Sequence, residues 1–268
     1  MGGKLGTALI TGASTGIGAT YADRLALRGY DLILVARDEA RLKDLAGKLK
    51  AKSGVHIDVL RADLTDVADL AKVEQRLKDD AAITLLVNNA GAAGGGGFAE
   101  PDADGLEKLI TLNVTAVTRL AAAAAPGFVA RGKGAIINLA SVVAYAPELM
   151  NGVYAATKAF VITLSKSLQL ELGPKGVYVQ TVAPAATATE IWDRSGMAIS
   201  SLPPGSVMSV DDLVDAALVG FDRREPISLP SLPDHGQWET LEAARLAMAL
   251  NFRNDKPAAR YRAVEAVG

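Results

Sequence analysis

The sequence predicts an α/β fold with a doubly wound parallel sheet of about seven strands and helices on both faces. Two observations lead to this prediction. Short apolar runs rich in β-branched residues alternate with longer segments whose apolar residues recur at helical spacing, and this order is typical of parallel strands joined by covering helices. The short runs are also almost continuously apolar, as expected for strands that are buried on both faces.

Six of these runs are predicted strands, and "ISLPS", after Glu225, is a possible seventh. The six are residues 6–10, 31–36, 56–60, 83–88, 134–140 and 177–183. The segments between them show the periodicity of amphipathic helices. The predicted helices are residues 16–28, 38–52, 66–79, 102–125 and 153–172, with a further helical run at 237–251. Because no low-complexity linker divides the chain, we predict a single domain, 1–268, that includes a C-terminal extension from about 225 to 268.

The composition disfavours several kinds of function. The 268 residues include no cysteine and only two histidines, so thiolate metal sites, cysteine nucleophiles and Ser-His-Asp triads are excluded or unfavourable. The 28 Lys and Arg residues nearly balance the 30 Asp and Glu residues, which argues against nucleic acid as a partner. The start of the sequence lacks the pattern of a secretion signal, and Pro126 and Gly127 interrupt an apolar stretch. We therefore expect a cytoplasmic protein with no membrane partner.

A glycine-rich turn, "TGASTGIGAT", joins the first predicted strand to the first predicted helix. Its glycines are Gly12, Gly16 and Gly18. In a dinucleotide site, such glycines permit a tight turn and let backbone N–H groups approach a pyrophosphate at the start of the helix. The spacing differs from the general G-x-G-x-x-G pattern, and an ordinary glycine-rich turn is the alternative. The strand-turn-helix context favours a dinucleotide cradle.

The end of the second strand carries the residues that would select the cofactor. Here "LVARDEARL" places Arg37 after the neutral Ala36. A guanidinium there suits the 2′-phosphate of NADP, whereas an acidic residue would favour NAD. We therefore predict NADP(H) over NAD, although Asp38 is close enough to argue for NAD and Arg37 could simply be a solvated helix-start residue. Asp63, after the third strand, is positioned to accept a hydrogen bond from adenine.

Several motifs together resemble the short-chain dehydrogenase/reductase family. They are "TGASTGIG", "NNAG" at 88–91, Asn113 in "LITLNV", Ser141 in "INLAS", and Tyr154 and Lys158 in "YAATK". Their order and approximate spacing match that family over about residues 5 to 190. The resemblance implies a Rossmann-like fold and an NAD(P)-dependent oxidoreductase that interconverts a carbonyl compound and a secondary alcohol.

Tyr154 and Lys158 stand four residues apart on a predicted helix, so both can address one bound molecule. A nearby ammonium should lower the pKa of the phenol and make it a better proton donor. Ser141 would hydrogen-bond the substrate oxygen. The family resemblance makes Tyr154 the general acid/base, gives Lys158 a second role at the nicotinamide ribose, and places Asn113 in a proton relay. An amphipathic Tyr/Lys pair without catalytic function is the alternative.

The resemblance also implies a wider set of cofactor-binding residues and a substrate lid at about 187–210. The predicted cofactor-binding residues are Gly12, Ser14, Thr15, Gly16, Ile17, Gly18, Arg37, Asp63, Leu64, Asn89, Ala90, Gly91, Tyr154, Lys158, Pro184, Thr187 and Thr189. Ala185 stands where the family usually has glycine, which predicts a strained or altered loop if that position needs a positive φ. The candidate apolar lining of the lid is Ile191, Trp192, Met197 and Ile199.

These observations predict a single dinucleotide-binding catalytic domain acting on a small carbonyl or alcohol substrate. The main alternative is a regulatory or scaffold protein that binds the nicotinamide cofactor without turnover. A hydrolase with Ser141 as nucleophile is unfavourable because Ser141 has no nearby histidine and lies in neither a G-x-S-x-G nor an S-x-x-K motif. The family resemblance further implies a homodimer or homotetramer. The sequence does not identify the substrate.

Overall fold

The computed structural model describes residues 5–94, 102–149, 152–192 and 199–262. The chain forms two compact units, Met1–Ser231 and Leu232–Gly268. The first unit contains the sheet, and the second contains helix α9 (Gly236–Leu250) and a short 3₁₀ turn (Ala259–Tyr261).

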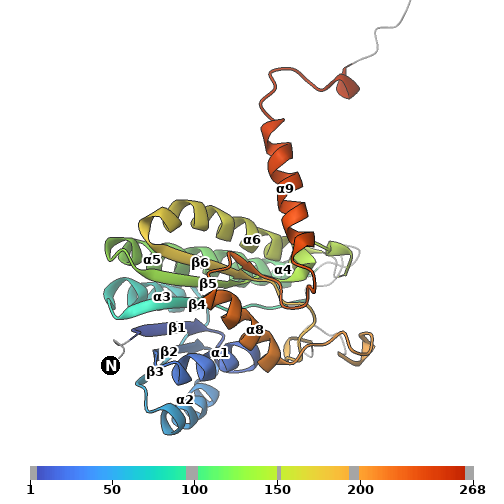
Figure 1. Ribbon diagram of the computed structural model, residues 1–268. Coiled ribbons are helices and arrows are strands. Elements are labelled where there is room, and N and C mark those ends of the chain that lie inside the picture. Colours follow the sequence, from blue (N-terminus) through green and yellow to red (C-terminus); the bar gives the residue numbers. More distant parts are fainter. Residues whose placement is uncertain (1–4, 95–101, 150–151, 193–198, 263–268) are drawn as a thin grey trace, which may run out of the picture. The chain divides into compact units, whose positions relative to one another are not determined.

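The first unit is built on a seven-stranded sheet whose described strands all pair in parallel, in the order β3-β2-β1-β4-β5-β6-β7 (Figure 1). The doubly wound, Rossmann-like fold predicted from the sequence is therefore confirmed. The order reverses direction between β1 and β4, and ligands of such sheets bind beyond the carboxyl ends of the strands at this point. The strands are β1 (Thr7–Thr11), β2 (Asp31–Ala36), β3 (Ile57–Arg61), β4 (Ile83–Asn88), β5 (Gly134–Leu139), β6 (Val177–Val182) and β7 (Ile227–Ser228).

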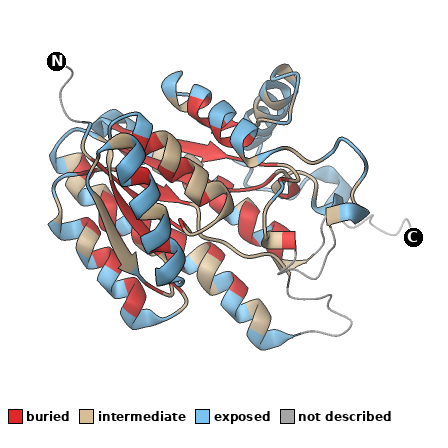
Figure 2. Ribbon diagram, turned by 90° about the horizontal axis from the view of Figure 1, so that it is seen from below, coloured by how far each residue is buried: buried red, intermediate tan, exposed pale blue. Residues whose placement is uncertain are grey.

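Helices cover both faces of the sheet. Figure 2 shows buried residues along the strands and on the inner sides of the flanking helices. The helices of the first unit are α1 (Gly16–Leu27), α2 (Glu39–Ser53), α3 (Val67–Asp79), α4 (Ala103–Ile110), α5 (Val117–Ala130), α6 (Val153–Leu172) and α8 (Val210–Asp222). Most bounds lie within a residue or two of the predicted ones, but α8 was not predicted.

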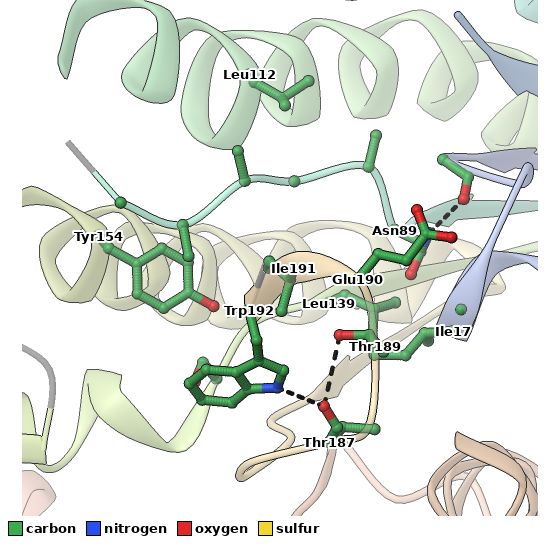
Figure 3. Close-up of a pocket in the computed structure, with 18 of the residues that line it drawn as sticks. Ile17, Asn89, Leu112, Leu139, Tyr154, Thr187, Thr189, Glu190, Ile191 and Trp192 are labelled. Atoms are coloured by element: carbon green, nitrogen blue, oxygen red, sulfur yellow. Dashed lines mark hydrogen bonds between the residues drawn. The ribbon is translucent and has the colours of Figure 1, made fainter. Parts of the chain in front are cut away.

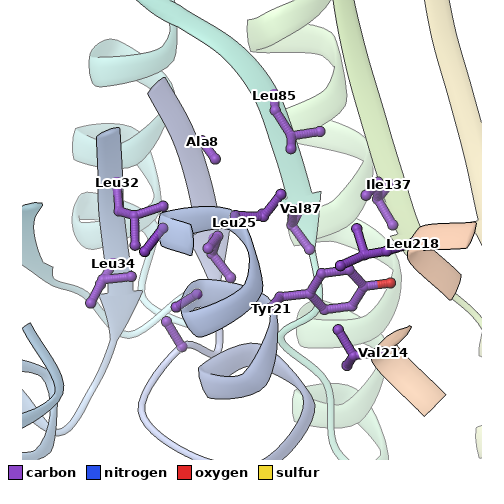
Figure 4. Close-up of a cluster of buried hydrophobic side chains, with 14 of the residues drawn as sticks. Ala8, Tyr21, Leu25, Leu32, Leu34, Leu85, Val87, Ile137, Val214 and Leu218 are labelled. Carbon is purple, nitrogen blue, oxygen red and sulfur yellow. The ribbon is translucent and has the colours of Figure 1, made fainter. Parts of the chain in front are cut away.

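Two apolar clusters form because successive strand residues point to opposite faces. On β1, Ala8 and Ile10 join one cluster and Leu9 joins the other. The first cluster packs α1, α2 and α8 on the sheet, and Figure 4 shows Tyr21 of α1 among Val214 and Leu218 of α8. The second cluster includes residues of α3 and α5. The sheet is thus held between two helical layers, which leaves its carboxyl edge to the loops.

The predicted helix at 102–125 differs from the observed one. Helix α4 passes through a π-helical turn, Thr111–Ala116, into α5, which continues through Pro126 to Ala130. Proline removes one helical hydrogen bond, and we expected Pro126 to interrupt the helix. The helix instead continues past it. Among the described residues, Ala103–Ala130 is the one helix long and apolar enough to cross a membrane. A core helix passes the same test, and Leu120, Ala124 and Phe128 of this helix lie in the second cluster.

Candidate active site

A cavity of about 1130 Å³ lies where the carboxyl ends of the strands meet. It is lined by the loops that follow β1 to β6, and Figure 3 shows part of its wall. All the predicted cofactor-binding residues line this cavity except Gly18. Of the predicted catalytic residues, Ser141, Tyr154 and Lys158 line it and Asn113 lies behind it. The fold thus brings together residues that are far apart in the sequence.

The turn between β1 and α1 has the features of an anion cradle. Gly12 and Gly16 have φ values of 65° and 54°, which favour glycine. Among the described residues, no side chain caps α1 at Thr15, and its first turn carries no acidic residue. The N–H groups and the positive end of the helix dipole therefore remain available to a pyrophosphate.

Gly18 packs directly against the cradle. A Cβ atom at this position would collide with the carbonyl oxygen of Gly12 and with the amide nitrogen of Asn89. The role of Gly18 is therefore to let α1 approach the turn closely, as expected for the third glycine of a dinucleotide motif.

Asn89 and Thr11 tie the cradle to β4. The Asn89 side-chain amide donates to the carbonyl oxygens of Thr11 and Gly12 at 2.8 and 3.2 Å. The Thr11 hydroxyl accepts from the backbone N–H groups of Asn89 and Ala90, both at 3.0 Å. These bonds hold the turn in place and give Asn89 and Ala90 of the "NNAG" motif a structural role. The glycine positions and the free helix terminus fit a dinucleotide.

Charged residues gather at the end of β2, where the adenosine ribose of a dinucleotide would lie. Arg37 is exposed and stands 4.0 Å from the Asp63 carboxylate. The Asp38 carboxylate turns toward its own helix and accepts from the backbone N–H of Arg41 at 3.0 Å, so it caps α2. This cap gives Asp38 a structural role that the sequence left open, and Arg37 and Arg41 line the cavity beside it.

Three of the predicted catalytic residues, Ser141, Tyr154 and Lys158, come from two neighbouring elements. Helix α6 begins after Gly152, whose φ is 84°, and carries Tyr154 and Lys158 on its first turns. Both side chains are buried, and Figure 3 shows the Tyr154 hydroxyl pointing into the cavity. Ser141 follows β5, and its hydroxyl donates to the carbonyl oxygen of Pro184 at 3.3 Å.

The pKa values of the Tyr154–Lys158 pair differ from the expectation. We expected the ammonium to lower the pKa of the phenol, but burial raises the pKa of Tyr154 to about 12, against a smaller lowering effect of a hydrogen bond with Ser141. Burial also lowers the pKa of Lys158 to about 8. The ammonium donates to the carbonyl oxygen of Leu139 at 2.9 Å and lies 5.7 Å from the centre of the Tyr154 ring. In the ligand-free protein, desolvation therefore outweighs the charge of the lysine.

Asn113 lies in the π-helical turn, a feature that often marks functional sites. Its side chain accepts from the N–H of Ala92 at 3.0 Å and donates to the carbonyl oxygen of Ala92 at 2.9 Å. It also donates to the Thr157 hydroxyl at 3.1 Å, which itself donates to the carbonyl oxygen of Tyr154 at 2.7 Å. Thr157, which the sequence analysis missed although it stands inside "YAATK", thus links Asn113 to the turn that carries the phenol.

The remainder of the cavity wall is mainly apolar. Ile191 and Trp192 contribute to it as predicted, but Ile199 does not line the cavity, and Met197 lies outside the described residues. The Trp192 indole N–H donates to the carbonyl oxygen of Thr187 at 2.7 Å, which fixes the ring against the wall (Figure 3). Further apolar lining that the sequence analysis did not identify comes from Leu109, Leu112, Val143, Leu149 and Leu202.

The loop after β6 is unstrained at Ala185. Among the described residues, Arg224 is the non-glycine residue with a positive φ, so Ala185 does not adopt the conformation that would have required glycine. Beyond it, a parallel bridge joins Thr187 to Met208, and the N–H of Ala188 donates to the carbonyl oxygen of Met208 at 3.0 Å. The two ends of the segment between Thr187 and Met208 are therefore held together.

This combination of fold and site defines a dinucleotide-dependent oxidoreductase of the α/β class. The cradle accepts a dinucleotide at one end of the cavity, and a buried serine, tyrosine and lysine line the other end beside an apolar wall.

The chain belongs to the short-chain dehydrogenase family, whose profile it matches over residues 6–198. It is 32% identical over 238 residues to a 2,5-dichloro-2,5-cyclohexadiene-1,4-diol dehydrogenase of Sphingobium indicum, a match that covers 86% of this chain and 95% of that protein.

Two solved structures are similar over nearly the whole chain. A short-chain dehydrogenase from Sphingobium yanoikuyae in complex with NADPH is 58% identical with a TM-score of 0.94, covering 96% of this chain and all of that one. A bulky-bulky ketone specific alcohol dehydrogenase from Comamonas testosteroni is 50% identical with a TM-score of 0.90, covering 97% of this chain and all of that one. Relatives with such names do not favour the alternative of a catalytically silent scaffold.

Proposed function

We propose that this protein uses NADPH to reduce ketones with two bulky apolar substituents to secondary alcohols, with Tyr154 as the general acid. The observation that carries the proposal is the convergence of Ser141, Tyr154 and Lys158 on a cavity with a nucleotide cradle at one end and an apolar wall at the other. The NADPH bound to one similar structure and the ketone specificity of the other support the choice of cofactor and substrate.

The arrangement supplies the proton chemistry of the reaction. When bound, the nicotinamide cofactor supplies the hydride. The substrate oxygen would accept hydrogen bonds from Ser141 and Tyr154, which stabilise the negative charge that develops there. Because burial raises the pKa of Tyr154 to about 12, the phenol keeps its proton at neutral pH and can give it to that oxygen. The protonated phenol suits the direction of reduction, and the ammonium of Lys158 would stabilise the phenolate that results.

The apolar wall explains the proposed substrate class. Leu109, Leu112 and Leu149 come from the loops and helix after β4 and β5, and Trp192 comes from the segment after β6. Apolar groups from several elements can receive hydrophobic substituents on both sides of a carbonyl group, and their burial favours binding by about 25 cal/mol per Å².

The test is NADPH oxidation, followed by absorbance, with a series of diaryl and aryl-alkyl ketones and with acetone. Bulky ketones should be reduced with the higher kcat/KM. Tyr154→Phe should lower turnover by about 10²- to 10⁴-fold while the NADPH dissociation constant stays within about twofold. Tyr30→Phe, outside the cavity, is the matched control. Tight NADPH binding without reduction of any ketone would instead support the scaffold alternative.

We also propose a cytoplasmic homodimer or homotetramer. The exposed Phe160 and Leu170, on the outer side of α6, support an interface there. Size-exclusion chromatography with light scattering should give two or four times the mass of one chain, and a monomer would refute the proposal.

A further inference from the structure

An ion pair crosses the mouth of the cofactor cavity. Arg41, on the first turn of α2, donates through one terminal nitrogen to both carboxylate oxygens of Glu190, at 3.0 and 3.1 Å. Glu190 directly follows Thr189, whose side chain lies against Gly16 of the cradle. Both members of the pair line the cavity, and both side chains are about half exposed.

The ion pair lies beside Arg37. Arg37 and Arg41 follow the end of β2, and both line the cavity. The Arg37 guanidinium stands 4.0 Å from Asp63. The Arg41 guanidinium binds Glu190 through a terminal nitrogen, and its Nε lies 3.4 Å from Asp38, the N-cap of α2. Two guanidinium groups held in this way form a site for a doubly charged anion, because an arginine fork fits phosphate oxygens and phosphate carries more charge than a carboxylate.

The contact between Arg41 and Glu190 is weak enough to be exchanged. A half-exposed ion pair contributes little net free energy, since the attraction is screened and two long side chains lose conformational freedom. A 2′-phosphate at the end of β2 would therefore compete with Glu190 for the guanidinium. NADH lacks that phosphate and would leave the pair intact.

We propose that Arg41 is a second ligand of the 2′-phosphate and that Glu190 is its internal competitor, so that the pair sets the ratio of NADPH to NADH affinity. This inference rests on the proposed preference for NADP. It makes Glu190 a specificity-determining residue that weakens NADPH binding without affecting NADH.

The experiment measures dissociation constants by calorimetry for NADPH, NADH, adenosine 2′,5′-bisphosphate and AMP. The proteins are the wild type, Arg41→Ala, Glu190→Gln, the double variant and Glu39→Gln. Glu39, on the same first turn of α2, pairs with Lys43 and does not line the cavity. Its variant therefore removes one negative charge nearby without releasing Arg41.

Arg41→Ala should raise the dissociation constants of the two nucleotides with a 2′-phosphate by about tenfold or more, as expected for loss of a charged hydrogen bond. The dissociation constants of NADH and AMP should stay within about twofold of the wild-type values. Glu190→Gln should lower the dissociation constants of the same two nucleotides by about two- to fivefold, which corresponds to the free energy of an exposed ion pair. In the Arg41→Ala background the Glu190 change should not alter any of the four dissociation constants, and Glu39→Gln should leave all four at their wild-type values.

Two other outcomes would overturn the inference. If Glu190→Gln changes NADPH and NADH binding equally, or has the same effect with and without Arg41, the pair is not a selector. If the wild type prefers NADPH and both single variants keep the same preference, the inference about the ion pair is refuted but the NADP assignment is not. A wild type that binds NADH as tightly as NADPH refutes the NADP assignment as well, whereas the ketone assay with Tyr154→Phe tests the chemistry separately.

Discussion

The side-chain ammonium of Lys158 donates to the carbonyl oxygen of Leu139 at the end of β5, at 2.9 Å, and both residues are buried. This bond anchors the lysine to the sheet. This contact and the full burial of the ammonium have consequences for stability and for pH dependence.

Lys158→Met should change how the free energy of unfolding depends on pH. Burial lowers the pKa of Lys158 to about 8, so the folded state releases this proton at a lower pH than the unfolded state, whose lysine titrates near 10.4. The charged lysine therefore destabilises the wild type below pH 8, and this cost disappears as the pH rises from 8 to 10. In urea denaturation, the free energy of unfolding of the variant should exceed that of the wild type by the largest amount at pH 7. A difference that does not vary with pH would contradict the assignment.

Gly18→Ala and Gly47→Ala should have opposite effects. The new methyl group at Gly18 meets the backbone of Gly12 and the Asn89 amide, whereas nothing lies within 4 Å at Gly47 in α2. We expect Gly18→Ala to cost about 1–3 kcal/mol of stability through overpacking and to weaken nucleotide binding. Gly47→Ala should add about 0.5–1 kcal/mol because alanine is the better helix former. Thermal unfolding and NADPH titration of both variants provide the comparison.

Tyr21→Phe should stabilise the protein. The Tyr21 hydroxyl is fully buried in the cluster of α1 and α8 (Figure 4), without a hydrogen-bond partner among the described residues. Its removal should add about 1 kcal/mol, because a buried unpaired polar group carries a desolvation cost. Denaturant titration at pH 7 measures the gain, with the exposed Tyr261→Phe as control.

The advantage of Tyr21→Phe should widen in alkali. Burial raises the pKa of Tyr21 far above its usual value, so stability from keeping this proton is present below pH 10 and is lost as the unfolded phenol ionises above it. The wild type should therefore lose stability faster than the variant between pH 9 and 11. Parallel pH curves for the two proteins would show that the hydroxyl is not buried.

Thr157→Val should lower kcat more than it raises KM. The change leaves the Asn113 amide without its hydroxyl partner and frees the carbonyl oxygen of Tyr154, at a cost of about 1–3 kcal/mol of stability. Thr157→Ser keeps the hydroxyl and should retain most of the activity, so it separates positioning from packing. If the serine and valine variants have equal kcat values, Thr157 has only a structural role.

The strands, the first glycine-rich turn and the position of the cavity could be predicted because their signals are local. Continuous apolar runs identify buried strands, and Gly12 and Gly16 mark a turn at which only glycine fits. Helix α8 was missed even though Ser209 precedes it as a capping residue, accepting from the N–H of Asp212. The sequence contained that signal, and it was not used.

Other features depend on contacts that no spacing reveals. The pKa of Tyr154 is set by burial under the loops and not by the lysine four residues away. The pairing of Arg41 with Glu190 joins residues 149 positions apart. The π-helical turn at Asn113 arises within a stretch whose periodicity predicts an ordinary helix. Such features follow from tertiary packing, which overrides local propensity.

The bridge between Thr187 and Met208 brings the two ends of the intervening stretch together at one place after β6. Thr187, Thr189 and Glu190, at the start of this stretch, line the same cavity as the cradle, and Thr189 lies against Gly16. Exchange of this stretch would therefore alter cofactor preference together with substrate preference.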